Sequence, residues 1–175
     1  MAPSNLTVLA AISAISVGFV DLSAFPFTPQ YNIRTVVTET PALSQSSWEF
    51  GTFSEALLEL YNPELSVFGD SPFPVPTLQK DDVQALSYLA PHITFGTSYN
   101  ALDPGAGGAA GDPASMGVGA VLLGKTNASF ADAANHTVYG LLNAVPRFWN
   151  GAISHRAEVA ELWYVFLPFL GPNII

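Results

Sequence analysis

The segment that decides the fold class is residues 46–63, which read SSWEFGTFSEALLELYNP. Ser46 followed three residues later by Glu49 is a capping box, in which the two side chains bond to free backbone amides at a helix start. Pro63 ends the pattern because it has no amide proton to donate. Apolar residues recur between these limits at helical spacing, namely Phe53, Ala56, Leu57, Leu60 and Tyr61. The segment therefore predicts a helix with one buried face.

The same signals predict further helices on both sides of a glycine-bearing loop, residues 103–111. The first of these helices runs from Asp81 or Asp82 to Pro91, and the second runs from an Asp112 N-cap, before Pro113, to about Gly124. The third runs from Asn127 or Ser129 to Ala144. The fourth begins at a Ser154 N-cap and carries Val159, Leu162, Trp163 and Phe166. Strand signals are weak, and Asn32 to Thr38 is the best of them. The sequence thus predicts an all-α chain of helical hairpins.

Composition excludes several classes of partner. The 175 residues are 49% hydrophobic and 11% charged, with a formal net charge of -9. Nucleic acids and anionic membrane surfaces need clustered Lys and Arg, and the chain has only five, widely scattered. There are no cysteines, and the histidines are isolated in sequence, so we expect no metal site. The glycine-bearing loop lacks the following GK[ST] of a phosphate-binding loop, so we also expect no cofactor.

The N-terminus resembles an export signal. Residues 6–20, LTVLAAISAISVGFV, are apolar but too short to span a bilayer comfortably, and cleavage after Leu22-Ser23-Ala24 is plausible. We therefore predict a signal peptide over residues 1–24, a secreted protein, and no stable membrane span. The alternative is an N-terminal helix packed within the domain. Two sequons, at Asn127 and Asn135, predict glycosylation on a solvated helix face.

Two basic residues and three tryptophans are the candidate binding residues. His155 and Arg156 follow a glycine-bearing turn and the predicted Ser154 N-cap. Positive charge is unfavourable at a helix N-terminus, so a bound anion or a functional need would explain them. The alternative is that His155 has a structural role, in which local hydrogen bonds satisfy its ring nitrogens. Indole rings can stack on sugars or pack in a core with a partner for the N–H group; the tryptophans are Trp48, Trp149 and Trp163.

The carboxylates do not identify a hydrolase site by themselves. Glu55 and Glu59 are four residues apart, and Glu158 and Glu161 are three apart. Such pairs usually lie on solvated helix faces, because like charges at this spacing repel mildly. Asp112 fits a helix cap, since a proline follows it.

Several motifs together resemble fungal six-hairpin glycosidase-like proteins. They are WEFGT (48–52), EALLEL (55–60), NPELSVF (62–68), DPAS (112–115), LLGKT (122–126), VPR (145–147), NGAISHR (150–156) and ELW (161–163). These proteins are similar to glycoside hydrolase families 88 and 105. The resemblance implies an (α/α)6 toroid of twelve helices with a cleft at its mouth. It also implies that an aspartate, as general acid and base, hydrates the C4=C5 bond of a terminal unsaturated uronic acid, after which the glycosidic bond breaks.

The chain departs from the family pattern at the catalytic aspartate. In the family, this residue closely follows the tryptophan that matches Trp163, and Pro-Phe-Leu comes next. Here residues 164–167 (YVFL) lead directly into residues 168–170 (PFL), so about one helical turn and its aspartate are missing. A general acid or base contributes ~100- to 10,000-fold in rate. We therefore expect the chain to be inactive in the family's reaction.

The chain is also short for the family fold. Twelve helices of about 12 residues each, together with their connections, do not fit in a 175-residue chain that also carries the predicted signal peptide. We therefore expect residues 25–175 to form the N-terminal part of the domain, an incomplete (α/α)6 toroid. His155 matches the family's Gly-x-x-x-His turn, which implies that it lines the cleft and that the partner is an oligosaccharide. Two alternatives are a non-catalytic secreted glycan-binding module and a small helical structural protein.

Overall fold

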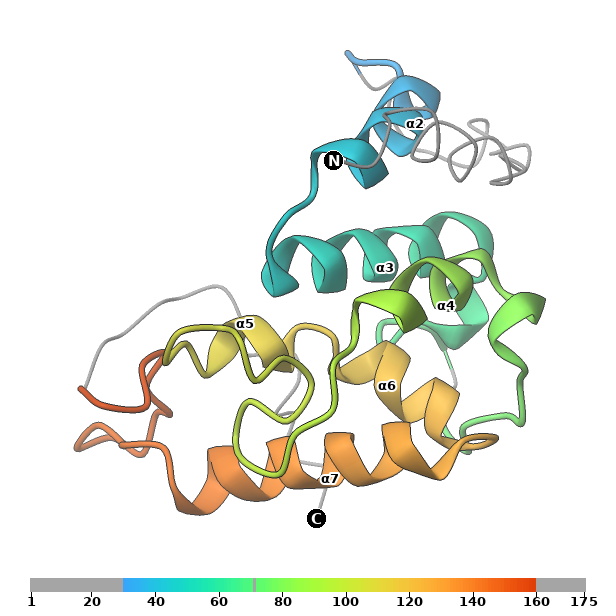
Figure 1. The fold of residues 1–175 in the computed structure, drawn as a ribbon. Coiled ribbons are helices and arrows are strands. Elements are labelled where there is room, and N and C mark those ends of the chain that lie inside the picture. The colour runs from blue at the N-terminus through green and yellow to red at the C-terminus, as the bar shows by residue number, and fades with distance from the viewer. Residues whose placement is uncertain (1–29, 71, 160–175) are drawn as a thin grey trace, which may run out of the picture. The chain divides into compact units, whose positions relative to one another are not determined.

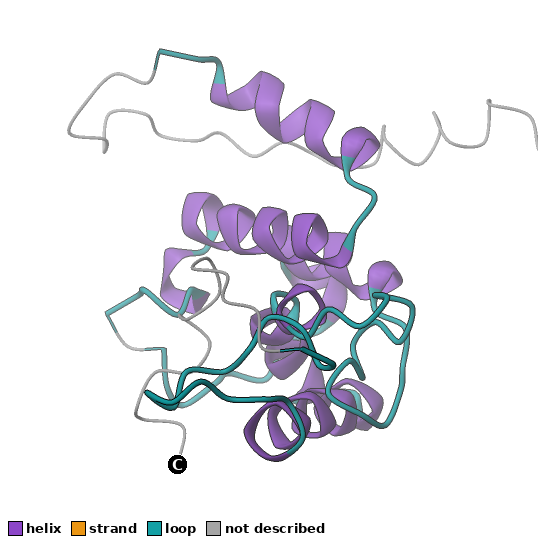
Figure 2. Ribbon diagram, turned by 90° about the vertical axis from the view of Figure 1, so that its left-hand side faces the viewer, coloured by secondary structure: helices purple, strands orange, loops and turns teal. Residues whose placement is uncertain are grey.

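The computed structural model describes residues 30–70 and 72–159 (Figure 1). These residues belong to two compact units, and the boundary between the units in the sequence follows Ser44. The described part is mostly helical, and its only strand-like pairings are two isolated β-bridges (Figure 2). The predicted all-α class is therefore confirmed. No helix among the described residues is long and apolar enough to cross a membrane. The predicted signal peptide and Trp163 lie outside the described residues.

The first unit contains helix α2, Ile33–Leu43. The strand predicted from Asn32 to Thr38 is therefore wrong. The Asn32 side chain caps the helix by accepting a hydrogen bond from the Thr35 amide at 3.2 Å. Two threonine hydroxyls also bond to carbonyls four residues back, Thr38 to Arg34 at 2.9 Å and Thr40 to Val36 at 2.7 Å. The Asn32 cap satisfies a free amide at the helix start, and the two threonine hydroxyls find acceptors within the helix. The β-branched residues of this segment are thus accommodated in a helix.

The second unit begins with α3, Ser47–Tyr61, where the structure confirms the predicted start and stop. Glu49 accepts hydrogen bonds from the amides of Gln45 and Ser46, at 2.7 and 2.9 Å. A short 3-10 helix, η2 (Pro63–Leu65), follows the end of α3. The buried face is displaced from the predicted stripe, because Leu60 and Tyr61 are only partly buried. Its members are Ser47, Gly51, Phe53, Ser54, Leu57 and Leu58.

The helix predicted to start at Asp81 or Asp82 forms in three pieces. They are the 3-10 helix η3 (Lys80–Asp82), α4 (Gln84–Leu89) and the 3-10 helix η4 (Ala90–His92). Val83 has extended dihedral angles, φ -133° and ψ 126°, and separates the first two pieces. The Asp82 carboxylate accepts a hydrogen bond from the Gln79 amide at 2.8 Å. The acidic residues therefore cap a single turn, and α4 starts after Val83.

Two further helices form a hairpin in which they pack along each other, α6 (Gly117–Gly124) and α7 (Ala128–Asn143). The Asn127 side chain caps α7 by accepting from the Ser129 amide at 3.1 Å, so this predicted start is confirmed. A Cβ at Gly124 would lie 3.0 Å from the backbone of Ala131, so glycine permits the close approach. The core of this unit includes Leu57, Leu58, Leu86, Leu89, Leu102, Met116 and Leu123.

The helix predicted from an Asp112 cap to Gly124 is interrupted. Residues Gly111–Ala114 form a separate helix, α5, and Ser115 and Met116 lie between it and α6. The residue at the N-cap position of α5 is Ala110, so Asp112 lies inside the first turn and is not the cap.

The helix predicted to start at Ser154 is absent over the described residues 154–159. The backbone of this segment pairs with other parts of the chain instead. The Ser154 amide donates to the Pro146 carbonyl at 2.8 Å, and the Ala157 amide donates to the Gly108 carbonyl at 3.1 Å. Because these bonds are strand-like and non-local, sequence periodicity could not reveal them.

The contact between α3 and α5 allows a test of the packing. A Cβ at Gly51 would overlap the Ser115 hydroxyl and lie 2.5 Å from its carbonyl oxygen. We predict that Gly51→Ala lowers the free energy of unfolding by about 1–3 kcal/mol, because the helices must separate. Urea unfolding followed by circular dichroism measures this.

Gly105→Ala is the control, since the nearest atom to its Cβ is a flexible Asp103 carboxylate oxygen at 3.3 Å. A Gly51→Ala protein as stable as the control would contradict the close α3–α5 contact.

Candidate functional site

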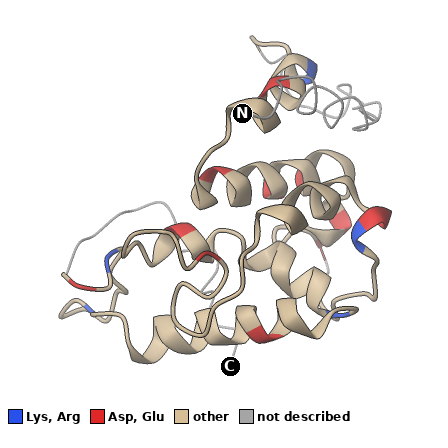
Figure 3. Ribbon diagram, viewed as in Figure 1, with Lys and Arg blue, Asp and Glu red and all other residues tan. Residues whose placement is uncertain are grey.

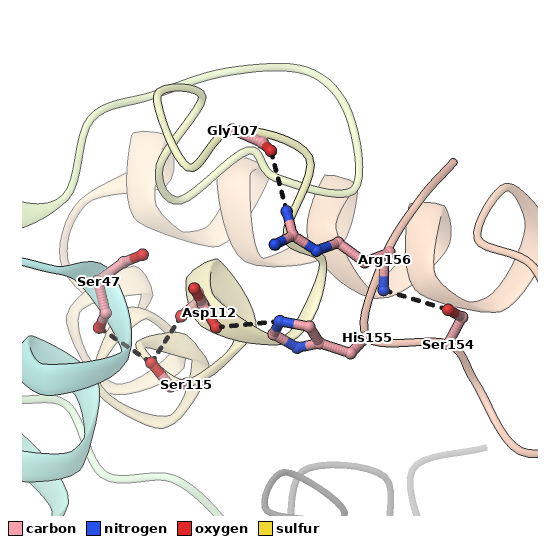
Figure 4. Close-up of polar contacts among 7 residues, drawn as sticks. All are labelled: Ser47, Gly107, Asp112, Ser115, Ser154, His155 and Arg156. Atoms are coloured by element: carbon pink, nitrogen blue, oxygen red, sulfur yellow. Dashed lines mark hydrogen bonds and ion pairs between the residues drawn. The ribbon is translucent and has the colours of Figure 1, made fainter. Parts of the chain in front are cut away.

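The structure brings Asp112 and His155, 43 residues apart in sequence, into one site (Figure 4). The His155 Nε2 atom lies 3.8 Å from Asp112 Oδ1, and the two side chains are 11% and 25% exposed. A carboxyl and an imidazole at this separation form an ion pair when the imidazole is protonated. Both groups are partly withdrawn from water yet reachable from it, as proton-transfer groups in binding sites are.

Backbone pairing with the glycine-bearing loop positions His155. The Ala110 amide donates to the His155 carbonyl at 2.7 Å, and Ala109 and Arg156 form an antiparallel bridge. Gly107 and Gly108 have φ angles of 61° and 88°, a region that disfavours residues with a side chain. The glycines therefore shape the loop so that its backbone meets the segment carrying His155.

Arg156 contacts the same loop. Its guanidinium donates a hydrogen bond to the Gly107 carbonyl at 3.3 Å, and its amide donates to the Ser154 hydroxyl at 3.1 Å (Figure 4). The predicted pair His155 and Arg156 thus lies on one rim of the site with Asp112. The structure places these basic groups in a loop, so the argument from a helix N-terminus does not apply to them.

Ser115 connects the other side of the site to α3. Its hydroxyl lies 2.7 Å from the Asp112 carbonyl and 3.0 Å from the Ser47 carbonyl (Figure 4). One hydroxyl proton serves these two acceptors, and Ser47 is buried. The link holds the backbone of the turn that carries Asp112 against the first turn of α3.

The electrostatics of the site favour protonation of Asp112. Burial raises the pKa of its carboxyl above the usual value, His155 and Arg156 partly offset this rise, and Asp103 adds to it. A carboxyl with a raised pKa keeps its proton closer to neutral pH and can then donate it as a general acid. The arrangement can therefore supply one acid–base carboxyl with a histidine beside it.

The tryptophans are placed differently. Trp149 lies at the tip of a turn closed by a Phe148 amide to Ala152 carbonyl bond of 2.9 Å, and its side chain is 97% exposed. Trp48 is also exposed, in the first turn of α3, next to Ser47. Neither has a core role in the described structure, so the alternative that they pack in the core is wrong. Trp163 lies outside the described residues.

Sequence reasoning missed two carboxyls. Asp112 was assigned to a cap because Asp-Pro is a common helix start, and only the fold shows that it faces His155. Glu55 was assigned to a solvated face, but it is half-buried and accepts a hydrogen bond from the Ser66 hydroxyl at 2.8 Å. Burial raises the pKa of Glu55 above its usual value. Glu55 therefore holds the loop after α3 and is not part of the site.

The sequence predicts no metal site and two glycosylation sites. Within residues 30–70 and 72–159, no group of three or more His, Asp or Glu side chains is arranged to hold a metal ion. The sequon residues Asn127 and Asn135 are both exposed, one at the N-cap of α7 and the other in its middle.

The raised pKa of Asp112 predicts a pH-dependent effect of Asp112→Asn. Ionised Asp112 opposes folding at neutral pH, so wild-type stability falls as pH rises through the folded pKa. The variant lacks this charge, and we expect its stability relative to wild type to be higher at pH 7 than at pH 3. Urea unfolding at a series of pH values measures the difference.

The control is Asp132→Asn, which changes an exposed carboxylate on α7. If the two variants showed the same dependence on pH, the withdrawal of Asp112 from water would be contradicted.

Comparison with known proteins adds no further constraint. No family model, no curated protein and no solved structure shows a significant match to this chain. The resemblance to six-hairpin glycosidase-like proteins therefore stays a prediction, and the function has to be argued from the site itself.

Proposed function

We propose that this protein is a secreted six-hairpin glycosidase-like protein of carbohydrate metabolism that holds an oligosaccharide at the Asp112–His155 site. The observation that supports the proposal is the partly buried Asp112 carboxyl, 3.8 Å from the His155 imidazole. The helical hairpin of α6 and α7 agrees with an arc of an (α/α)6 toroid. The exposure of both sequons agrees with passage through a secretory route.

Asp112 is suited to the chemistry that the resemblance implies. In an unsaturated uronyl residue the ring oxygen stabilises positive charge on C5, so a general acid protonates C4 and water adds to C5. One carboxyl can donate this proton and regain one from the attacking water. Asp112 has the raised pKa that such an acid needs, and His155 stands where it can hold the carboxyl in place.

Turnover is expected to be slow at best. The aspartate that the family pattern places just after Trp163 is missing from the sequence, and losing a general acid or base costs ~100- to 10,000-fold in rate. In the absence of that aspartate, we assign the role of general acid and base to Asp112, which lies beside His155. We accordingly propose that the chain binds such oligosaccharides more readily than it hydrolyses them.

The distribution of charge is compatible with a sugar ligand. Lys and Arg occupy short, separate stretches of the ribbon (Figure 3). Near the site, Arg156 and His155 offer positive charge, while Asp112 and Asp103 offer negative charge. A uronyl carboxylate would therefore bind on the side of Arg156, and neutral hydroxyls would bind toward Asp112.

A second candidate function is non-catalytic glycan binding. The observation in its favour is the exposure of the Trp149 ring at the tip of a turn. This turn is well supported, because the Arg147 guanidinium donates to the carbonyls of Gly151 and Leu142, at 2.8 and 3.2 Å. An exposed indole on a hydrogen-bonded turn is a suitable platform for a sugar ring.

The leading proposal is tested with an unsaturated uronyl disaccharide and the whole chain. Isothermal titration measures binding, and the loss of ultraviolet absorbance of the C4=C5 bond measures turnover. We expect saturable binding, slow turnover, and a further ~100-fold or larger loss of turnover in Asp112→Asn with binding retained. Asp132→Asn is the matched control and should behave like wild type.

Turnover in Asp112→Asn at the wild-type rate would contradict the assignment of Asp112. The second candidate is distinguished by Trp149→Ala. If this change abolishes binding while His155→Gln leaves it intact, the ligand is held at the exposed indole and not at the Asp112–His155 site.

A further inference from the structure

The outward face of α7 carries a sequon beside two exposed apolar side chains. Asn135, Tyr139 and Leu142 are spaced four and three residues apart, so they lie on one side of the helix. Tyr139 is 70% exposed and Leu142 is 44% exposed. The opposite face is buried in the core, and its members are Phe130, Ala133, Ala134, Thr137, Gly140 and Leu141. Two large apolar groups therefore remain in water next to a glycan acceptor.

We propose that Asn135 carries an N-linked glycan whose first sugars lie over Tyr139 and Leu142. The inference rests on the proposed export of the chain, because the donor is a polyprenyl-diphosphate-linked oligosaccharide of the secretory route. The Asn135 Nδ2 atom forms a bond to C1 of the first sugar. The bond between C1 and the diphosphate oxygen breaks, the diphosphate leaves with the electron pair, and the amide loses one proton.

The geometry fits the length of the first sugars. At a rise of 1.5 Å per residue, Tyr139 lies about 6 Å and Leu142 about 10 Å from Asn135 along the helix axis. The exposed phenol ring offers a face on which a sugar can stack. Covering these side chains removes apolar surface from water, which stabilises the folded, glycosylated chain.

The other sequon provides a comparison within the same helix. Asn127 is the N-cap of α7, and its Oδ1 atom accepts from the Ser129 amide at 3.1 Å. The residues around it, 125–129, are exposed and carry no large apolar side chain. A glycan bound to Nδ2 of Asn127 leaves the cap intact and has no apolar surface to cover. The two glycans should therefore differ in their effect on stability.

The structure also orders glycosylation and folding. Thr137, the hydroxyl residue of the Asn135 sequon, is completely buried, with 0% exposure. An enzyme that must reach both Asn135 and Thr137 cannot do so once α7 is packed. Glycosylation of Asn135 therefore precedes the packing of α7, and the folded chain is not an acceptor at this position.

The experiment expresses the whole chain in a eukaryotic secretory host, together with the variants Asn135→Gln and Ser129→Ala. The second variant removes the Asn127 sequon but keeps the Asn127 side chain that caps α7. Glycopeptide mass spectrometry determines the occupancy of each sequon. Binding of an apolar dye and the melting temperature report the exposed surface. We expect Asn135 to be occupied, and we expect Asn135→Gln to bind more dye and to melt roughly 2–4 °C lower. Ser129→Ala should change neither quantity, because the cap of α7 is retained and the Asn127 glycan has no apolar surface to cover.

Added dye binding in Asn135→Gln should disappear when Tyr139→Ser is combined with it, which ties the effect to the covered ring. Export without a glycan on Asn135 would overturn the proposal alone, whereas failure of the chain to be exported would overturn the proposed location as well. Equal dye binding and equal melting temperatures in the two sequon variants would show that the Asn135 glycan does not cover Tyr139 and Leu142, and would contradict the proposal. Glycan transfer to Asn135 in a folded, unglycosylated chain would overturn the inferred order.

Discussion

The structure of the site depends on the close contact between the first turns of α3 and the short helix α5. Gly51 has no side chain, and this lets α3 lie directly against Ser115. The Ser115 hydroxyl then reaches the carbonyls of both Ser47 and Asp112. A bulkier residue at position 51 would separate the two helices and release the turn that carries Asp112. Packing in the core and the geometry of the site are therefore set by the same contact.

The second half of the site is held by backbone pairing and not by a helix. The segment after α7 turns at Gly151, where φ is 85°, and returns along residues 146–148. It then pairs with the glycine-bearing loop through the carbonyl of His155 and the amide of Ala157. Gly107 and Gly108 allow that loop to meet it. Segments with no regular secondary structure can thus position a histidine well, provided their backbone groups are paired.

The parts of the fold that sequence reasoning predicted are those with local causes. The Ser46–Glu49 cap, the stop at Pro63 and the Asn127 cap all act within four residues, and the structure confirms them. The errors have non-local or competing causes. Helix α2, which the Asn32 side chain caps, forms where a weak strand signal was present, and long-range pairing replaces the helix predicted at Ser154.

The candidate site shows the same division between features with local causes and features with non-local causes. His155 and Arg156 could be singled out from their positions in the chain, but their partner could not. Asp112 carries the local signature of a helix cap, and its role follows only from the tertiary contact with His155. Trp149 was predicted without knowledge of its surroundings, and its full exposure leaves a binding role open to it.

The coupling of Asp112 and His155 is tested most directly by a carbon-13 NMR titration of the Asp112 carboxyl in the wild-type chain and in His155→Gln. In wild type, burial should hold the pKa of Asp112 above the usual value for an aspartate. Replacing His155 removes a positive charge that lowers this pKa, so it should rise further in the variant. An Asp112 carboxyl that titrates at the same pH in both chains would contradict the pairing on which the proposed site rests.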